Sequence, residues 1–157
     1  MTEILWGDTP FRVSTSHYLT VQWDGWAVNL NAWTDEFLNY DYIGAPCWWK
    51  PTLRVGNGGF SLRSTKLGRF VVEHNLQYPE SEPEDEVLCQ VYRPSLESNG
   101  FEWAPVELAQ QFSFEHGEPA PGGSFGFHDC RNWTRILNRE RLNQRLARAN
   151  AYVGFDA

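Results

Sequence analysis

Basic residues and cysteines are scarce in this chain of 157 residues, and both shortages limit what the protein can be. Lysine and arginine total 13 against 20 aspartates and glutamates, and the formal net charge of −7 argues against sequence-independent binding of nucleic acid. The cysteines, Cys47, Cys89 and Cys130, are odd in number, widely spaced and without a Cys-x-x-Cys pair. This pattern argues against a disulfide framework or a zinc site. It favours buried thiols in a reducing compartment, so we expect a cytoplasmic protein.

Long apolar runs are also absent. No stretch approaches the roughly 20 apolar residues that span a bilayer, and the N-terminus lacks the basic and apolar regions of a secretory signal. We therefore expect neither a transmembrane segment nor a secretory signal. What the sequence does contain is 41% hydrophobic residues, 15% aromatic residues and eight tryptophans, which suffice for the packed core of one domain.

The order of local patterns predicts the fold class. β-Branched and aromatic residues indicate strands in residues 18–29 (broken at Asp24-Gly25), 41–46, 101–104 and 112–115. Apolar spacing indicates a helical turn in residues 33–38 and helices from Ser64 or Thr65 to about His74, from Val87 to near Pro94, and from Pro105 to Phe112. Strands that alternate with short helices indicate an α/β fold, in which these helices flank a mixed sheet.

The C-terminal part is expected to form an amphipathic, arginine-rich helix. From Trp133 onward, apolar positions fall on one side, at Ile136, Leu137, Leu142 and Leu146, and six arginines lie between Arg131 and Arg148. A solvated face explains these charges; contact with acidic partners or anionic lipid is the alternative. We therefore divide the chain into a domain of residues 1–135 and a helix and tail of residues 136–157.

A glycine-dense segment, Gly56-Asn57-Gly58-Gly59-Phe60-Ser61-Leu62-Arg63-Ser64, is the most informative part of the sequence. Glycines let backbone groups approach a ligand closely or adopt positive φ, so the segment suits a binding loop. The alternative is a simple hairpin, because Asn-Gly is a favoured two-residue turn. Arg63 has the geometry to pair with a phosphate, and the alternative is an ordinary surface arginine at a strand end.

Two residues suggest a metal site. Asp24 stands where a strand is expected to end, beside Gly25, and its carboxylate is placed to hold a metal ion or a ribose hydroxyl. His128 follows Phe125-Gly126-Phe127, and one ring nitrogen can bind the same divalent metal. The alternatives are a turn aspartate bonded to its own backbone and a structural histidine. Two ligands do not define a site, so substrate phosphates and water would complete the shell.

An acidic group is expected to open a helix. Glu84, Asp85 and Glu86 precede the apolar run that begins at Val87, and the free N–H groups of a helix start stabilise ionised carboxylates. Such a carboxylate suits a base that accepts a proton from a hydroxyl nucleophile; the alternative is a capping acid in a solvated loop. Trp48 and Trp49, in an aromatic loop, offer flat faces to sugar rings, although core packing is the commoner use of tryptophan.

The order of these pieces resembles the later half of GT-A type glycosyltransferases, which carry an aspartate motif, a glycine loop, an acidic pair and a late histidine. More closely, the chain resembles a glycosyltransferase-like family catalogued as a domain of unknown function. The matching pieces span roughly residues 4–135 and are Gln22-Trp23-Asp24-Gly25, the run from Trp33 to Pro46, the segment Gly56–Ser64, Pro83-Glu84-Asp85, Phe112-Ser113-Phe114-Glu115 and Phe125-Gly126-Phe127-His128.

The resemblance implies transfer of a sugar from a nucleotide-sugar donor to the hydroxyl group of a glycan acceptor. Asp24 would hold the donor's metal ion or ribose, and His128 would meet the metal or the pyrophosphate. Gly56, Asn57, Gly58 and Gly59 would line the sugar, and Asp85 or Glu84 would be the base. A divalent metal ion, manganese or magnesium, would neutralise charge on the departing diphosphate.

The resemblance also implies that something is missing. A GT-A domain begins with a nucleotide-binding β-α-β half, but here only a short segment precedes Asp24. We therefore expect a shortened product, a fragment, or one part of a split enzyme whose partner chain supplies that half. Two other functions remain open. One is a non-catalytic carbohydrate-binding or assembly module, and the other is metal-dependent hydrolysis by Asp24 and His128.

Overall fold

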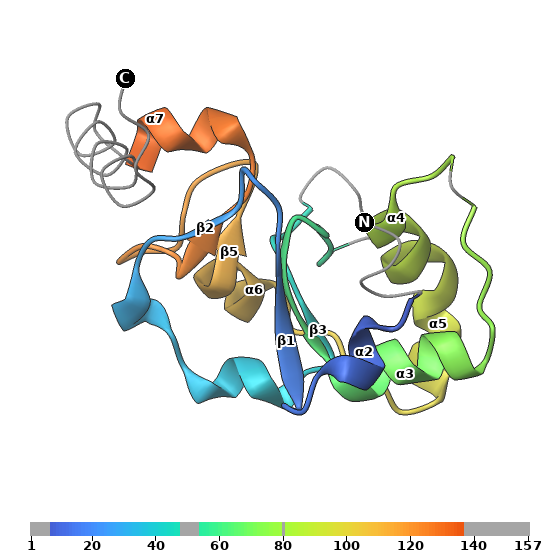
Figure 1. Ribbon diagram of the computed structural model, residues 1–157. Helices are drawn as coiled ribbons and strands as arrows, with labels where there is room; N and C mark the ends of the chain where they lie inside the picture. Colours follow the sequence, from blue (N-terminus) through green and yellow to red (C-terminus); the bar gives the residue numbers. More distant parts are fainter. Residues whose placement is uncertain (1–6, 48–53, 80, 137–157) are drawn as a thin grey trace, which may run out of the picture.

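The computed structural model describes residues 7–47, 54–79 and 81–136, and it is a mixed α/β fold of small sheets and short helices (Figure 1). The strands are β1 (His17–Val21), β2 (Trp26–Ala27), β3 (Tyr42–Ile43), β4 (Phe60–Ser64), β5 (Ser113–Phe114) and β6 (Gly126–Phe127). The α-helices are α2 (Thr9–Arg12), α3 (Thr65–Glu73), α4 (Glu84–Glu86), α5 (Arg93–Ser98), α6 (Val106–Phe112) and α7 (Trp133–Ile136). Three short 3-10 helices are η1 (Leu30–Ala32), η2 (Asp35–Asn39) and η4 (Cys130–Asn132), and η3 (Val87–Tyr92) is a π-helix.

Two separate sheets replace the single mixed sheet that the sequence predicts. The first has the order β1-β4-β3 and is antiparallel throughout, with Leu62 of β4 opposite Leu19 and Ile43. The second has the order β2-β6-β5, in which β6 pairs antiparallel with β2 and parallel with β5. In Figure 1, helices α2, α3, α4 and α5 lie on one side of β1 and β3, and the second sheet lies on the other with α6 and α7. Strand β4 is therefore covered on both faces and buried along its whole length.

Aromatic side chains make up much of the core between the two sheets. Phe112 of α6 lies 5.2 Å from Phe37 and 5.4 Å from Phe60, measured between ring centroids, and Phe125 packs against the same group. Such tilted and edge-to-face pairs contribute about 0.5–1.5 kcal/mol each beyond their buried area. Two cysteines, Cys47 and Cys89, are buried free thiols as expected, whereas Cys130 is exposed.

Helix α3 confirms the predicted cap. The Ser64 hydroxyl accepts a hydrogen bond from the backbone N–H of Leu67 at 3.0 Å, which satisfies one free donor of the first turn. The same hydroxyl donates to Asp41, at the start of β3. Helix α6 likewise begins after Pro105 as predicted. These local signals fix where the chain leaves β4 and where it returns toward β5.

One predicted boundary is wrong. The helical segment that begins at Glu84 does not stop near Pro94 but runs through η3 into α5 and ends at Ser98. Pro94 lies in the first turn of α5, directly after the π-helix η3, so a proline inside this segment does not end it. The predicted strand at residues 101–104 is reduced to a bridge between Trp103 and Tyr42.

The C-terminal prediction is tested only at its beginning. Helix α7 starts at Trp133, as the apolar spacing indicates, and residues 137–157 lie outside the described residues. Within the described part, Arg131 pairs with Asp129, and Arg135 pairs with Glu118 at 2.7 Å. Among the residues that the structure describes, no helix is both long and apolar enough to cross a lipid bilayer.

The glycine loop owes its path to close backbone contact with the chain after β3. A Cβ atom on Gly44 would lie 2.0 Å from the carbonyl oxygen of Gly56, so only glycine fits there. The Tyr42 hydroxyl donates to the carbonyl of Asn57 at 3.1 Å, and Asn57 has a φ of +71°, which asparagine tolerates. Because Val55 and Gly56 already pair with Pro46 and Ala45, the Asn57-Gly58 pair lies along one arm of the antiparallel connection between β3 and β4 and is not its turn.

Candidate functional site

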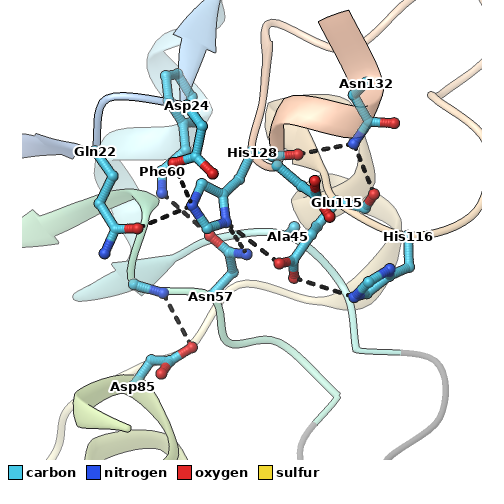
Figure 2. A network of polar contacts seen from close by, with 12 residues as sticks. Gln22, Asp24, Ala45, Asn57, Phe60, Asp85, Glu115, His116, His128 and Asn132 are labelled. Atoms are coloured by element: carbon cyan, nitrogen blue, oxygen red, sulfur yellow. Dashed lines mark hydrogen bonds and ion pairs between the residues drawn. The ribbon is translucent and has the colours of Figure 1, made fainter. Parts of the chain in front are cut away.

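Five segments that are distant in sequence meet around one cavity of about 280 Å³. Its lining comes from the end of β1, the glycine loop, the start of α4, and the residues that follow β5 and β6: Gln22, Asn57, Gly58, Gly59, Tyr78, Pro83, Glu84, Asp85, Glu115 and His128. Asp24 lies beside His128, as Figure 2 shows. The site residues inferred from sequence are thus largely brought together, although Trp48 and Trp49 lie outside the described residues.

His128 occupies the centre of this group and has protein partners on both ring nitrogens (Figure 2). Its Nε2 atom lies 3.0 Å from Gln22 Oε1 and 3.2 Å from Asp24 Oδ1. Its Nδ1 atom lies 3.0 Å from Asn57 Nδ2 and 3.3 Å from Glu115 Oε1. The ring also packs against the glycine loop, because a Cβ atom on Gly59 would lie 2.1 Å from Nε2.

These partners suit both protonation states of the imidazole. In the neutral ring, Nε2–H donates to Gln22 while Nδ1 accepts a hydrogen bond from the Asn57 amide. In the protonated ring, Nδ1–H faces Glu115 instead. Burial lowers the pKa of His128, but its hydrogen bond to Glu115 and the charges of Glu115 and Asp24 outweigh this, so the pKa is raised above its ordinary 6.5. The site therefore favours a positively charged ring.

Asp24 lies beside Nε2 of this ring and Glu115 lies beside Nδ1, and the two carboxylates differ in their hydrogen bonds. The Oδ1 atom of Asp24 is buried and accepts no hydrogen bond, so its nearness to Nε2 is an ionic contact rather than a directed bond. Asp24 is thus not a turn aspartate that bonds only its own backbone. Burial raises the pKa of Glu115, but hydrogen bonds from His128 and Asn57 lower it below its ordinary 4.5. Glu115 consequently favours its ionised form beside the charged ring.

A resident divalent metal ion does not fit the described residues. Asp24 and His128 lie together, as a shared ligand role requires, but both ring nitrogens of His128 already face protein groups. In the described ranges, no group of three or more histidine, cysteine, aspartate and glutamate side chains could hold an ion. We therefore assign no step of the chemistry to a metal held by the protein.

Asp85 faces the glycine loop from the start of α4. The backbone N–H of Gly58 donates to Asp85 Oδ2 at 3.1 Å. Burial, together with the charge of Glu84, raises the pKa of Asp85 above its ordinary 3.8, while the Gly58 hydrogen bond and Arg63 oppose this rise. A carboxylate of raised pKa at a cavity wall is suited to accept a proton.

Glu84 and Arg63 form a buried pair beneath the cavity. The guanidinium contacts both carboxylate oxygens, with Nη2 3.1 Å from Oε2, and Arg63 Nε donates to Ser61 Oγ at 3.0 Å. Arg63 is only 1% exposed, so the alternative of a surface arginine is wrong. Its guanidinium is engaged by Glu84 rather than open to a phosphate. Because the Glu84 carboxylate is engaged as well, Asp85 is the better candidate for a base.

Three residues of the site were not singled out from the sequence. Glu115 had a signal, since alternation along Phe112-Ser113-Phe114-Glu115 places it on the face opposite the two buried phenylalanines. Neither Gln22 nor Tyr78 carries a local signal of its own. Gln22 Oε1 lies 3.0 Å from Nε2 of His128 and so helps to hold the ring in place.

The pH dependence of stability tests the charged state of His128. Because its pKa is raised on folding, the protonated ring stabilises the fold below about pH 6.5, and this contribution is lost as pH rises through the folded-state pKa. We expect His128→Gln to lower Tm by several degrees more near pH 5.5 than near pH 8.5, since 1 kcal/mol corresponds to about 2–4 °C at this size. The exposed His74 of α3 provides the control, His74→Gln. Equal losses at both pH values would contradict the assignment.

The fold and the site together define a small mixed α/β protein with a polar, histidine-centred cavity. The chain belongs to a family described as a protein of unknown function, DUF5672, whose model matches residues 3–128 and so includes every residue that lines the cavity. No curated protein and no solved structure matches the chain.

Proposed function

We propose that the protein transfers a sugar from a nucleotide-sugar donor to the hydroxyl group of an acceptor. The observation that supports this most is the convergence of Asp85, the glycine loop and the Asp24–His128 contact on one cavity. These groups come from four parts of the chain, and each has a chemical task in sugar transfer. The resemblance of the sequence motifs to GT-A type glycosyltransferases points to the same reaction.

Asp85 acts as the base in this proposal. Its carboxylate accepts the proton of the acceptor hydroxyl while the hydroxyl oxygen bonds to the anomeric carbon and the bond from that carbon to the diphosphate breaks. The Gly58 N–H bond holds the carboxylate in place, and its raised pKa increases its affinity for the proton. Gly58 and Gly59, without side chains, let the sugar approach the backbone.

His128 meets the departing diphosphate. Among the residues that line the cavity, it is the one side chain that can carry a positive charge, and Asp24 and Glu115 hold it. The lining carboxylates nevertheless outnumber this imidazole, so a diphosphate that arrives with its own Mg²⁺ or Mn²⁺ enters more favourably than a bare one. The ion then belongs to the substrate and not to a site on the protein.

Calorimetry with nucleoside diphosphates tests the proposal. We expect at least one of UDP, GDP, CDP and ADP to bind with a dissociation constant of about 1 mM or tighter, and to bind better with Mg²⁺ or Mn²⁺ than with a chelator. His128→Gln should weaken this binding, whereas His74→Gln should not. If none of the four nucleotides binds at millimolar concentration, with or without metal, the proposal is overturned.

The size of the cavity favours a second candidate, a non-catalytic carbohydrate-binding module. At about 280 Å³ it lies just below the roughly 300–1,000 Å³ of typical ligand sites and suits a single sugar ring better than a sugar with its nucleotide. Such a module binds glycans without a base, so its binding survives Asp85→Asn and Asp24→Asn. Loss of glycan binding in both variants would favour the transferase.

A further inference from the structure

A second, larger hollow of about 720 Å³ lies beside η1 and shares no lining residue with the cavity around His128. It is formed by Asn29 and the segment Asn31–Thr34, by Gln111 of α6 and by the loop Ala120–Gly123. Its volume is in the range of about 300–1,000 Å³ that ligand sites occupy. None of the residues that line it is charged, although 21% of the chain is charged. This lining excludes recognition of an ionic group and leaves a neutral ligand.

Trp33 gives this hollow a fixed aromatic wall. Its indole N–H donates to Asp35 Oδ1 at 3.2 Å, and its ring meets Phe37 and Phe125 edge-on at centroid distances of 5.5 and 5.2 Å. The side chain nevertheless remains 38% exposed. An aromatic ring that is already immobilised loses little entropy when a flat apolar surface stacks on it.

Amide side chains surround this wall. Asn29 Nδ2 donates to the carbonyls of Gly122 and Gly123, both at 3.3 Å, and so holds the loop that closes one side. Gly122 and Gly123 have φ values of +88° and +92°, which glycine permits. Asn31 and Gln111 have no side-chain hydrogen bond to any described residue. Each can therefore offer both a donor and an acceptor to a ligand.

We propose that this hollow binds a neutral saccharide, with a sugar ring stacked on Trp33 and its hydroxyls bonded by Asn31 and Gln111. Sugars combine an apolar ring face with hydroxyls that both donate and accept, which is what this lining complements. The site does not depend on the transfer reaction proposed above. If that reaction occurs, the hollow anchors an acceptor chain, since Phe125, which packs on Trp33, lies three residues before His128, about 10 Å along an extended strand.

Saccharide titrations test the proposal. Four neutral trisaccharides, maltotriose, cellotriose, mannotriose and triacetylchitotriose, would be titrated while binding is followed by tryptophan fluorescence and by saturation-transfer NMR. We expect at least one to bind in the millimolar range or tighter, and Trp33→Ala to weaken it at least tenfold. The double variant Asn31→Ala/Gln111→Ala should weaken it at least threefold. Because this double variant removes no hydrogen bond to a described residue, we expect it to fold, and it tests the proposal even if Trp33→Ala unfolds.

The control is Leu30→Ala, in the same turn, because Leu30 is 74% exposed and does not line the hollow. The proposal is overturned if trisaccharide affinity is unchanged in both the Trp33 and the amide variants. It is also overturned if none of the four trisaccharides binds. Binding of a charged polysaccharide such as polygalacturonate in their place overturns it as well. Retention of trisaccharide binding in His128→Gln separates this site from the cavity around His128, and its loss there would assign the binding to that cavity instead.

Discussion

Replacing Arg63 by alanine is expected to lower the free energy of unfolding by about 3–5 kcal/mol, because it leaves the buried carboxylate of Glu84 without a counter-charge. Arg63 is 1% exposed and Glu84 is 6% exposed, so water does not replace the lost guanidinium. The Ser61 hydroxyl loses the hydrogen bond that it accepts from Arg63 and keeps the one that it donates to the carbonyl of Gly58. Urea unfolding followed by tryptophan fluorescence measures the change.

Two variants show whether burial of the pair causes this loss. Arg12 pairs with Asp8 at 3.2 Å on the surface, and Arg12→Ala should cost less than about 1 kcal/mol. The double variant Arg63→Met/Glu84→Gln removes both charges and should recover much of the stability that Arg63→Ala loses. A loss below about 1 kcal/mol for Arg63→Ala would mean that the pair does not hold α4 against β4.

Asp85→Asn is expected to reduce the rate of sugar transfer by about 10²–10⁴-fold, the usual contribution of a positioned base. The amide has the same shape and can still accept the Gly58 hydrogen bond through its oxygen, so the fold and donor binding should be retained. The rate would be measured as release of nucleoside diphosphate from the donor that calorimetry identifies. In the wild type, the acidic limb of the pH–rate profile should lie above pH 3.8, because the pKa of Asp85 is raised.

Glu86→Gln is the matched control for this change. Glu86 lies in the same helical turn but does not line the cavity, so the variant removes one charge from α4 without touching the proposed base. Its transfer rate should stay within about threefold of the wild type, as expected for a residue outside the reacting groups. If Asp85→Asn also retained the rate within tenfold, Asp85 would not be the base.

Local signals made part of this structure predictable. The Ser64 cap, Pro105 before α6 and the apolar spacing at Leu67 and Val71 each act within one helical turn, and the predicted helices begin where those signals lie. The glycine loop was also recognisable, because the sequence itself shows where a side chain is missing. Asp85 and His128 were suspected as reactive groups only from the order of the motifs and their resemblance to GT-A type glycosyltransferases, because each residue by itself also suits a structural role.

Long-range pairing was not predictable in the same way. Strands β5 and β6 have two residues each and pair in parallel, so their partners are set by the core around Phe112 and Phe125 and not by their own sequence. The ion pair of Arg63 with Glu84 joins residues that each look like surface charges in isolation. Both residues are buried in the folded protein, and the sequence alone does not show which charged side chains form ion pairs.

The π-helix η3 has a consequence for the two carboxylates that precede it. This stretch, Val87–Tyr92, joins α4 to α5, and a π turn holds one residue more than the α turn that could replace it. Deleting one residue there would let the π turn close as an α turn and would leave α4 and α5 nearly in register, whereas deleting a second residue would rotate α4 about its axis by about 100° relative to α5 and move it by about 1.5 Å. Glu84 would then swing away from Arg63, and Asp85 from Gly58. The number of residues in this segment, as much as their identity, sets the direction in which the side chains of Glu84 and Asp85 point.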